Sequence, residues 1–290
     1  MARLHTSRQS TSQPRTAGPR VGRWLVAVPM AALAIATVYP LVFTANVAMK
    51  TRHEYVLDRF SPAEALRWDA FVTAWASADM DRYLANSLIV VSGSVALLLL
   101  FGSMAGFALS QLRFRGSRAL FLGCLAALFI PFQVIMVPLA RTMGQTGLID
   151  TYPGLILAYV AQFLPFTVFL MTSYYSGIPA EIIDAARIDG NSVYGVYGRI
   201  MLPLGRPALL SVGILNALFC WNDVLIALLM MPSAEHRTLM VGVTSLRGQY
   251  SADIPTFAGG VLIAAVPVLA LYLVFQRQIA SGVTAGSTKG

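Results

Sequence analysis

Charged residues are scarce in this sequence, and cysteine is almost absent. Only 12% of the 290 residues are Asp, Glu, Lys or Arg, whereas 57% are hydrophobic. Water-soluble domains carry about 25% charged residues, so the composition indicates a protein whose main solvent is a lipid bilayer. The two cysteines, Cys124 and Cys220, lie in different apolar runs and outside any C-x-x-C pattern. They indicate neither a disulfide framework nor a zinc site.

Nucleotide-binding and catalytic patterns are also missing. The sequence contains no G-x-x-x-x-G-K-S/T loop, so we expect that the chain does not hydrolyse ATP and is not an enzyme. All three histidines, His5, His53 and His236, lie outside the long apolar runs. No nucleophile stands beside a base, which argues against an intramembrane protease. We predict no metal and no cofactor.

Long apolar runs are what the sequence has in abundance. A helix needs about 20 apolar residues to cross a hydrocarbon core of about 30 Å. Six stretches are long enough, and short alternating strands typical of a membrane β-barrel do not occur. The stretches are 24–46, 85–110, 118–140, 153–176, 207–231 and 257–276. We therefore predict an all-α polytopic membrane protein with six transmembrane helices.

The net charge of +8 is distributed in a way that predicts orientation rather than nucleic-acid binding. Cytoplasmic segments of membrane proteins carry an excess of Lys and Arg. If the basic N-terminal segment is cytoplasmic, two arginine groups fall on the same side, and most of the 13 acidic residues fall on the other. These groups are Arg113, Arg115 and Arg118, and Arg187, Arg199 and Arg206. We predict both termini in the cytoplasm and no nucleic-acid partner.

The chain divides into a tail and one membrane domain. Residues 1–23 are rich in Ser, Thr, Gln, Arg and Pro, cannot bury a core, and are predicted to be a disordered basic cytoplasmic tail. Residues 24–290 form the six-span domain. Its longest outer loop, 47–84, is predicted to hold one or two interfacial helices, with Trp68 and Trp75 at headgroup depth.

Small residues and prolines mark particular places in the spans. Gly102, Gly106 and Ser110 recur every four residues, a pattern that allows two membrane helices to approach closely. Proline interrupts the third and fourth spans and predicts kinks or half-helices there. The residues concerned are Pro131, Pro138 and Pro165.

The fifth span carries an acid at membrane depth. As a helix it places small and polar residues on one face, namely Gly213, Asn216, Cys220, Asp223 and Ala227. Burying Asp223 costs about 2.5 to 3.5 kcal/mol on insertion, so this face should contact protein or water. Two interpretations stay open: Asn222 and Asp223 hold a neighbouring helix, or Asn216, Asn222 and Asp223 line a translocation path.

Charge gathers again in the loop 177–206, which contains "PAEIIDAARIDG" at residues 179–190. We predict a helix of about ten residues from Pro179 to Gly190, which can take a left-handed conformation. Asn191 or Ser192 would cap a second helix that runs to Pro203. Ile182, Ile183 and Ala186 would share an apolar arc, opposite Glu181, Asp184 and Arg187. Connectors need about four to six residues, so this loop predicts a docking surface. A helix that lies on the lipid surface would need a basic polar face. This helix would carry three acids and one arginine, so lipid docking is disfavoured.

Several ordered segments of the chain resemble one known family. These are "NSLIV", "IPFQVIMVPLARTMGQTGLIDTYPGLIL", "PAEIIDAARIDG", "LPLGRPAL", "WND" and "GVTAGSTKG". Together they resemble the inner-membrane permease subunits of binding-protein-dependent ABC importers, carbohydrate branch, in particular the maltose-type second permease subunit. The resemblance implies the type I importer permease fold, with a cytoplasmic coupling helix between spans four and five that sits in a cleft of an ATPase subunit.

The resemblance also implies partners and site residues. The expected partners are a sister permease in a heterodimer, two cytoplasmic ATPase subunits, an extracytoplasmic solute-binding protein and membrane lipid. The family's Glu-Ala-Ala corresponds to Asp184, Ala185 and Ala186, and its glycine to Gly190. Glu181 and Asp189 flank the position of Ala185, where close approach requires a small side chain, and complete the expected ATPase-coupling set. The sequence departs from the family at Asp184, where Glu is usual, and at Asn191, where Ala is usual. The C-terminal segment adds Lys289 as a further candidate contact with the ATPase.

The outer loop 232–256 is expected to face the solute-binding protein. Its candidate contacts are Glu235, His236, Arg237, Arg247 and Tyr250. Two other function classes remain as alternatives. An ion-coupled secondary transporter would use Asp223 as a relay, and a non-transporting scaffold would tolerate changes at Asp223 and in the charged loop.

Overall fold

The computed structural model describes the backbone of residues 20–77, 79–112, 114–249 and 253–285, and the side chains of 25–77, 79–112, 114–246 and 253–276. Most of the predicted tail, together with Tyr250 and Lys289, lies outside the described residues. The side chain of Arg247 does so as well. The first helix begins at Arg20, inside the segment predicted as tail.

Every regular element within the described ranges is helical. The elements are α1 (Arg20–Ala48), α2 (Arg52–Leu57), α3 (Asp69–Ser77), α4 (Met80–Gln111), α5 (Ser117–Ala127), α6 (Phe132–Gln145), α7 (Tyr152–Ser176), α8 (Ala180–Ile188), α9 (Val193–Val196), the π-helical turn η1 (Tyr197–Met201), α10 (Leu202–Leu204), α11 (Arg206–Asn222), α12 (Leu225–Met230), α13 (Leu239–Gln249) and α14 (Ile254–Ala285). The prediction of an all-α membrane protein is confirmed.

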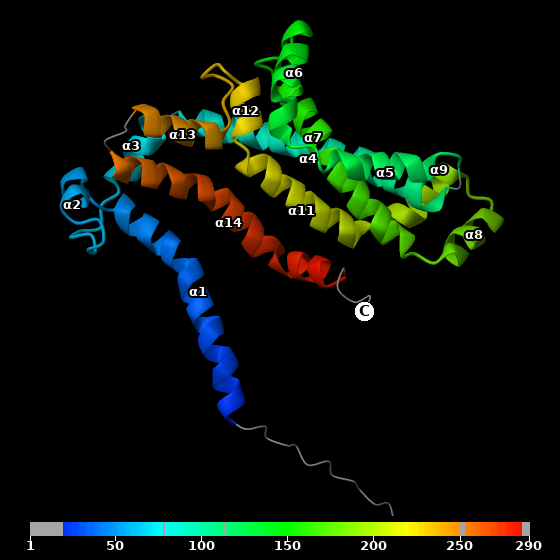
Figure 1. Cartoon of the computed structure of the whole chain (residues 1–290), viewed down its shortest axis with the longest axis horizontal. Helices are drawn as coiled ribbons and strands as arrows, with labels where there is room; N and C mark the ends of the chain where they lie inside the picture. The colour runs from blue at the N-terminus through cyan, green and yellow to red at the C-terminus, as the bar shows by residue number, and fades with distance from the viewer. Residues whose placement is uncertain (1–19, 78, 113, 250–252, 286–290) are drawn as a thin grey trace, which may run out of the picture.

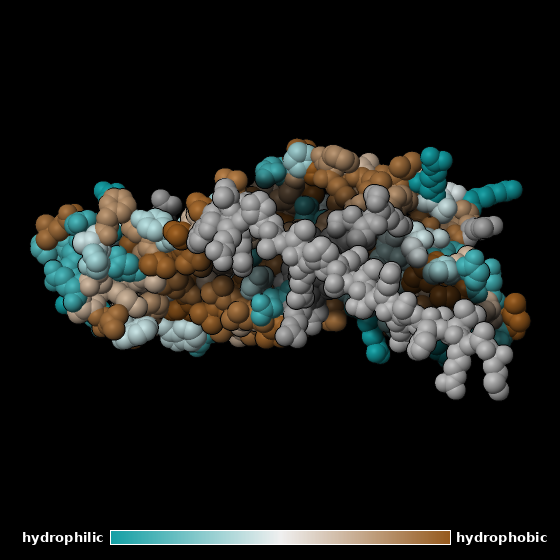
Figure 2. Space-filling view, turned by 90° about the horizontal axis from the view of Figure 1, so that it is seen from below, coloured by the Kyte–Doolittle hydropathy of each residue, from teal (hydrophilic) through white to brown (hydrophobic). Residues whose placement is uncertain are grey.

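Four of these helices form an elongated bundle. In Figure 1, α4, α7, α11 and α14 lie along one another, with α8 at one end of the bundle and α3 and α13 at the other. We call these the α8 end and the α3 end. On the face drawn in Figure 2, hydrophobic side chains cover most of the coloured surface between the two ends, and hydrophilic ones collect toward these ends. This distribution fits an apolar band of lipid between two aqueous faces.

The helices α4 and α7 approach each other through glycine. They run in the same direction, because Gly93 lies against Ile156 toward one end and Gly106 lies against Met171 toward the other. A β-carbon on Gly106 would stand 2.7 Å from Cβ of Met171 and 2.9 Å from the backbone nitrogen of Thr172. The predicted packing role of the small residues on α4 is therefore confirmed at this position, where only glycine fits.

The number of spans depends on two bent helix pairs. Four helices, α1, α4, α7 and α14, are long and apolar enough to cross a membrane. Two further pairs qualify if each is one span: α5 with α6, bent by 99°, and the helix 193–204 with α11, bent by 74°. The first of these pairs corresponds to the predicted third span, broken at 128–131, with Pro131 directly before α6.

The predicted fifth span is not one helix. The stretch 207–231 was expected to be continuous, but α11 ends at Asn222 and α12 begins at Leu225. The backbone of Asp223 between them is extended, with φ −70° and ψ 136°. The helical face predicted to join Gly213 to Ala227 is therefore interrupted at Asp223.

The α4–α7 contact makes a stability prediction. Adding a methyl group at Gly106 (Gly106→Ala) should destabilise the protein by about 1 to 3 kcal/mol, because Met171 and the backbone of α7 leave no space. Gly123→Ala is the matched control, because nothing lies within 4 Å of a β-carbon there. Alanine normally stabilises a helix relative to glycine by about 0.5 to 1 kcal/mol. Thermal unfolding of the two variants in detergent should shift in opposite directions, and equal midpoints would refute the close contact.

Candidate functional site

The α8 loop, residues 177–206, contains the helix that the sequence predicted. α8 runs from Ala180 to Ile188 and its chain then turns at Gly190, whose φ of +82° is left-handed. The N–H of Gly190 donates to the carbonyl of Arg187 (3.0 Å), and the N–H of Asn191 donates to that of Ala186 (3.1 Å). This pair of bonds is the Schellman arrangement that ends a helix at glycine. Any other residue at position 190 would be strained.

Two polar side chains reinforce the corner. The Asn191 side-chain nitrogen donates to the Ala186 carbonyl at 3.1 Å, so this asparagine helps to close the end of α8. The Ser192 hydroxyl accepts from the N–H of Gly195 at 3.2 Å. Of the two residues predicted to cap the second helix, Ser192 is therefore the cap.

One side of α8 packs on the bundle. Ile183 and Ala186 are 2% and 4% exposed and lie in a cluster with Met171 and Tyr175 of α7. Ile182, the third residue of the predicted apolar arc, is not buried with them, because its side chain is 41% exposed. The surface of the bundle under α8 buries only two of its side chains, Ile183 and Ala186, which are three positions apart on one face of the helix. Ile182 points away from this surface.

The other side of α8 is a continuous exposed surface that ends at the corner. It combines three carboxylates, one arginine, a small residue and two large apolar side chains. Ile188 is 86% exposed. The exposed residues are Glu181, Ile182, Asp184, Ala185, Arg187, Ile188, Asp189 and Gly190. All the sequence-predicted coupling residues except the buried Ala186 therefore lie together on this surface.

The second half of the α8 loop is fixed to α4 and α7. The hydroxyls of Ser103 and Tyr197 are 2.7 Å apart, and the Tyr174 hydroxyl donates to the carbonyl of Leu204 at 2.9 Å. Gly205, at the bend into α11, lies so close to the Tyr175 ring that a β-carbon would stand 2.7 Å from its hydroxyl. The α8 loop therefore contacts the ends of α4 and α7 and leads directly into α11.

Asp223 explains the break between α11 and α12. Its Oδ2 accepts from the Tyr159 hydroxyl at 3.1 Å and from the N–H of Ala227 at 3.0 Å. A carboxylate at this position satisfies N–H groups that the start of α12 leaves without helical partners. The extended backbone at Asp223 brings its carboxylate to these donors. Hydrophobic periodicity alone does not predict this break in the helix.

The three polar residues proposed for a path are not on one surface. Asn216 is fully buried and donates to the Thr167 hydroxyl of α7 at 2.9 Å. Asn222 is exposed beside the break and donates to the carbonyl of Leu218 at 2.8 Å. The structure therefore groups Asn222 with Asp223 and leaves Asn216 between two helices.

An aromatic group lies next to the break and was missed from the sequence. Phe163 and Phe219 are stacked with ring centroids 5.6 Å apart, and Phe163 also contacts Tyr159, the partner of Asp223. Phe166 meets Phe219 edge-on at 5.5 Å. These rings are i, i+4 and i, i+3 neighbours on α7, but only the fold brings Phe219 to them.

A second polar group lies at the α3 end, where it holds the segment 232–238. Asp150 accepts from the N–H and hydroxyl of Ser233 at 3.2 and 2.8 Å through Oδ1, and its Oδ2 lies 3.2 Å from Nδ1 of His236. Asn86 of α4 donates to the carbonyls of Glu235 and Arg237 at 2.9 and 3.0 Å. We call these residues the Asp150 cluster. The segment is held from α4 and from the turn that precedes α7, and the side chain of Glu235 is exposed.

Three of the candidate contact residues in the loop 232–256 lie in or beside the Asp150 cluster. His236 is paired with Asp150, Glu235 is exposed, and the guanidinium of Arg237 turns back to the Ser245 hydroxyl (3.4 Å) and the Pro232 carbonyl (3.3 Å). Asp150 was not singled out from the sequence because its partners lie more than 80 positions away. Among the described residues no three His, Cys, Asp or Glu side chains are grouped as a metal site requires.

Residues 98–280 match the family described as "Binding-protein-dependent transport system inner membrane component". The matched range includes the α8 loop, the break at Asp223 and the segment 232–238. The chain belongs to this family. It is a multi-pass membrane permease component of a binding-protein-dependent transport system, and its helices α1 to α3 lie outside the matched range.

Two relatives and one solved structure illustrate what the permease is similar to. It is 32% identical to a diacetylchitobiose uptake system permease protein of Streptomyces coelicolor over 87% of this chain and 84% of that protein. It is 34% identical to an arabinooligosaccharides transport system permease protein of Halalkalibacterium halodurans over 92% and 96%. A crystal structure of a bacterial ABC transporter that imports alginate has the same fold, with a TM-score of 0.76 and 22% identity, covering 89% of this chain and 96% of that one.

The Asp150 cluster predicts a dependence of the permease's stability on pH. Partial burial of Asp150 opposes ionisation, but the hydrogen bonds from Ser233 and His236 outweigh it and hold the pKa below its ordinary value. A carboxyl with a lowered folded-state pKa stabilises the fold above about pH 4, and this stabilisation is lost as the pH falls further.

We expect the thermal midpoint to fall more steeply for the wild type than for Asp150→Asn between about pH 6 and about pH 3.5, by about 2 °C or more. The amide cannot titrate, so the variant should be less stable at pH 6 and change less with acid. Glu64→Gln, an exposed acid outside the cluster, is the control and should follow the wild type. Parallel acid profiles for the wild type and Asp150→Asn would contradict the assignment.

Proposed function

We propose that the permease is one of two non-identical membrane subunits of a carbohydrate importer, and that α8 is its coupling helix, seated in a cleft of a cytoplasmic ATPase subunit. The observation that carries the proposal is the exposed surface of α8 itself. The helix is held on the bundle by Ile183 and Ala186, and its other side exposes acids, a small residue and two isoleucines. A docking helix needs this combination of apolar and charged contacts.

In the proposed orientation the α8 end and both termini are cytoplasmic. Arg115, Arg118, Arg199 and Arg206 belong to segments at the α8 end, and acids such as Asp58, Asp81 and Asp150 belong to segments at the α3 end. This asymmetry supports the orientation. The sequence-based proposal that Lys289 reaches the ATPase concerns a residue outside the described part of the chain.

Asp184 is the proposed ion-pair partner of an ATPase arginine or lysine. Its contact with Arg187 is long, at 4.0 Å, and both side chains are largely exposed, at 68% and 46%. An exposed pair of this kind contributes little stability, so Asp184 is available to a partner. Ala185, on the same surface, permits the close approach that the contact needs, and Glu181 and Asp189 add charge around it. Hydrolysis of ATP belongs to the partner, because this chain has no nucleotide-binding loop.

The proposed solute is a carbohydrate, because relatives that match most of this chain are named for the uptake of diacetylchitobiose and arabinooligosaccharides. The proposed path contacts are Asn222 and Asp223, together with the exposed edge of Phe219, since aromatic rings and amides are the groups that sugar sites use. Asn216 would support this path from within the protein, through Thr167.

The alternative of an ion-coupled secondary transporter loses its main support. It would need Asp223 as a relay, but Oδ2 of Asp223 is engaged by Tyr159 and Ala227, and the family is one of binding-protein-dependent systems. The segment 232–238 is the proposed contact with the solute-binding protein at the α3 end, with Glu235 at its exposed part.

Charge reversal on α8 tests the coupling role. Asp184→Lys should reduce co-purification of the ATPase subunits with the tagged permease, and uptake of the labelled solute, by about tenfold or more, because losing a charged contact at an interface costs about 2 kcal/mol or more. Glu64→Lys, an exposed acid at the α3 end, is the matched control and should behave as the wild type.

Thermal unfolding of the Asp184→Lys protein keeps the result interpretable. Because Asp184 is exposed and makes only the 4.0 Å contact, the variant should unfold at the wild-type temperature. Normal co-purification and normal uptake in Asp184→Lys would rule out α8 as the ATPase contact.

A further inference from the structure

One buried amide holds the middle of the segment 232–238. Asn86 of α4, only 3% exposed, donates to the carbonyl of Glu235 at 2.9 Å and to that of Arg237 at 3.0 Å. An asparagine amide has two N–H donors and one carbonyl acceptor, so these two bonds use both donors. Because backbone carbonyls only accept hydrogen bonds, the amide nitrogen has to face them, and Oδ1 of Asn86 faces away from the segment.

The hydroxyl of Tyr152 completes the bonds to this amide. Tyr152 is the first residue of α7, and its hydroxyl donates to Oδ1 of Asn86 at 2.7 Å. Its ring meets the ring of His236 edge-on, with centroids 5.3 Å apart. The hydroxyl therefore acts on the segment through Asn86, whereas the ring contacts the segment directly. A phenylalanine at position 152 would keep the ring contact and lose the bond to Asn86.

The two ends of the segment are held by other residues. Near one end, Asp150 accepts from the N–H and the hydroxyl of Ser233. Just beyond the other end, Ser87 of α4, also 3% exposed, accepts from the N–H of Leu239 at 2.8 Å. Removing the Tyr152 hydroxyl does not remove these bonds. Its loss should therefore loosen the middle of the segment, where the exposed Glu235 lies, without releasing the segment.

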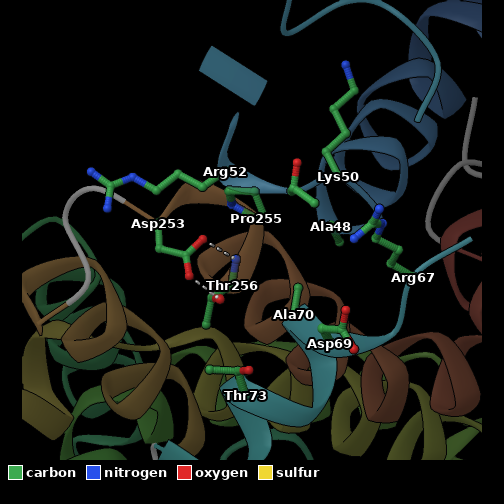
Figure 3. A pocket seen from close by; sticks show the side chains of 11 residues that line it. Ala48, Lys50, Arg52, Arg67, Asp69, Ala70, Thr73, Asp253, Pro255 and Thr256 are labelled. Carbon is green, nitrogen blue, oxygen red and sulfur yellow. Dashed lines mark hydrogen bonds between the residues drawn. The ribbon is translucent and has the colours of Figure 1, made fainter. Parts of the chain in front are cut away.

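A polar cleft at the same end of the molecule offers a comparison. It has a volume of about 170 Å³ and lies between the end of α1, the start of α3 and the start of α14 (Figure 3). There the Asp253 carboxylate accepts from the hydroxyl of Thr256 at 2.7 Å, and Thr256 is 3% exposed. This bond is as short as the one from Tyr152, but it joins residues three apart in the chain. The bond from Tyr152 instead connects α7 to α4 and, through Asn86, to the segment 232–238.

We propose that Tyr152 and Asn86 are positioning residues for the contact with the solute-binding protein. The Tyr152 hydroxyl fixes the Asn86 amide, and the amide holds the backbone of residues 235–237 in the conformation that the partner binds. A contact segment that is ordered before association loses less conformational entropy when it binds. The inference rests on the proposed docking role of the segment 232–238 and extends it to two residues outside that segment.

A nitroxide label attached at Glu235→Cys, in a background in which the two native cysteines are replaced, measures the positioning directly. Tyr152→Phe should increase the mobility of the label, and Asn86→Ala should increase it further. The double variant should equal Asn86→Ala, because the hydroxyl acts only through the amide and the two effects are not additive. Thr256→Val, which removes the bond of equal length in the polar cleft, is the matched control and should leave the mobility unchanged.

Uptake by the intact transporter in proteoliposomes tests the contact with the partner. The probe is the purified solute-binding protein of the same transport system, carrying its sugar. Tyr152→Phe should raise the concentration of this protein that gives half-maximal uptake by about fivefold or more, as expected for one lost hydrogen bond, and leave the maximal rate unchanged. A merely structural role would lower the maximal rate and leave that concentration unchanged. Tyr55→Phe is the control, because the Tyr55 hydroxyl forms no hydrogen bond with the residues that the structure describes.

Glu235→Lys separates a failure of this inference from a failure of the proposed docking role. If Glu235→Lys raises the half-maximal concentration and Tyr152→Phe does not, the segment docks but Tyr152 does not position it. If neither variant changes that concentration, the docking role fails and the inference fails with it. Unchanged mobility of the label in both Tyr152→Phe and Asn86→Ala would overturn the positioning by itself. Because Tyr152→Phe removes a single oxygen atom, the variant should fold as the wild type, which its thermal midpoint checks.

Discussion

The close approach of α4 and α7 is the contact on which the rest of the permease depends. Lipid is as apolar as leucine, so burial of apolar surface cannot drive two membrane helices together, and close packing of small residues has to do so. Gly106 provides that contact by admitting Met171 and the backbone of α7. Met171 and Tyr175, one turn apart on α7, then form the surface on which Ile183 and Ala186 of α8 rest. The position of α8 is thus set inside the bundle.

The second constraint is that backbone groups in an apolar environment need partners. Two interruptions of helices among the described residues are closed by polar groups close to them in the chain. At Gly190 the left-handed turn and the Asn191 side chain close the end of α8. At Asp223 the carboxylate takes an N–H from the start of α12. The irregular places are therefore as well defined as the helices, and they are also where the proposed partner and solute contacts lie.

Local signals were enough to predict α8. Its first residues, its glycine end and the cap on the following helix depend on neighbouring residues only, and the structure has them where the sequence indicated. The exposure of Ile182 could not be predicted in the same way, because it depends on how much of α8 the side chains of α7 cover. Helical periodicity places Ile182 and Ile183 on the same apolar arc, but tertiary packing buries only Ile183.

Contacts between distant parts of the chain were the features that sequence reasoning missed. The break at Asp223 depends on Tyr159, and the segment 232–238 depends on Asp150 and Asn86. Hydropathy counted the stretch 207–231 as one span because a single acid hardly changes its average, although that acid ends the helix. The six apolar stretches themselves were informative because membrane thickness fixes the length of any helix that crosses it.

The central claim is that α8 is seated in an ATPase subunit, and photo-crosslinking tests it most directly. A benzoylphenylalanine residue in place of Ile188, which is 86% exposed, should form a covalent adduct with the ATPase subunit in membranes. The same residue in place of Val56, which is 73% exposed near the opposite end, should not. Adducts from position 188 that contain only lipid or water, in a transporter that still takes up its solute, would contradict the account.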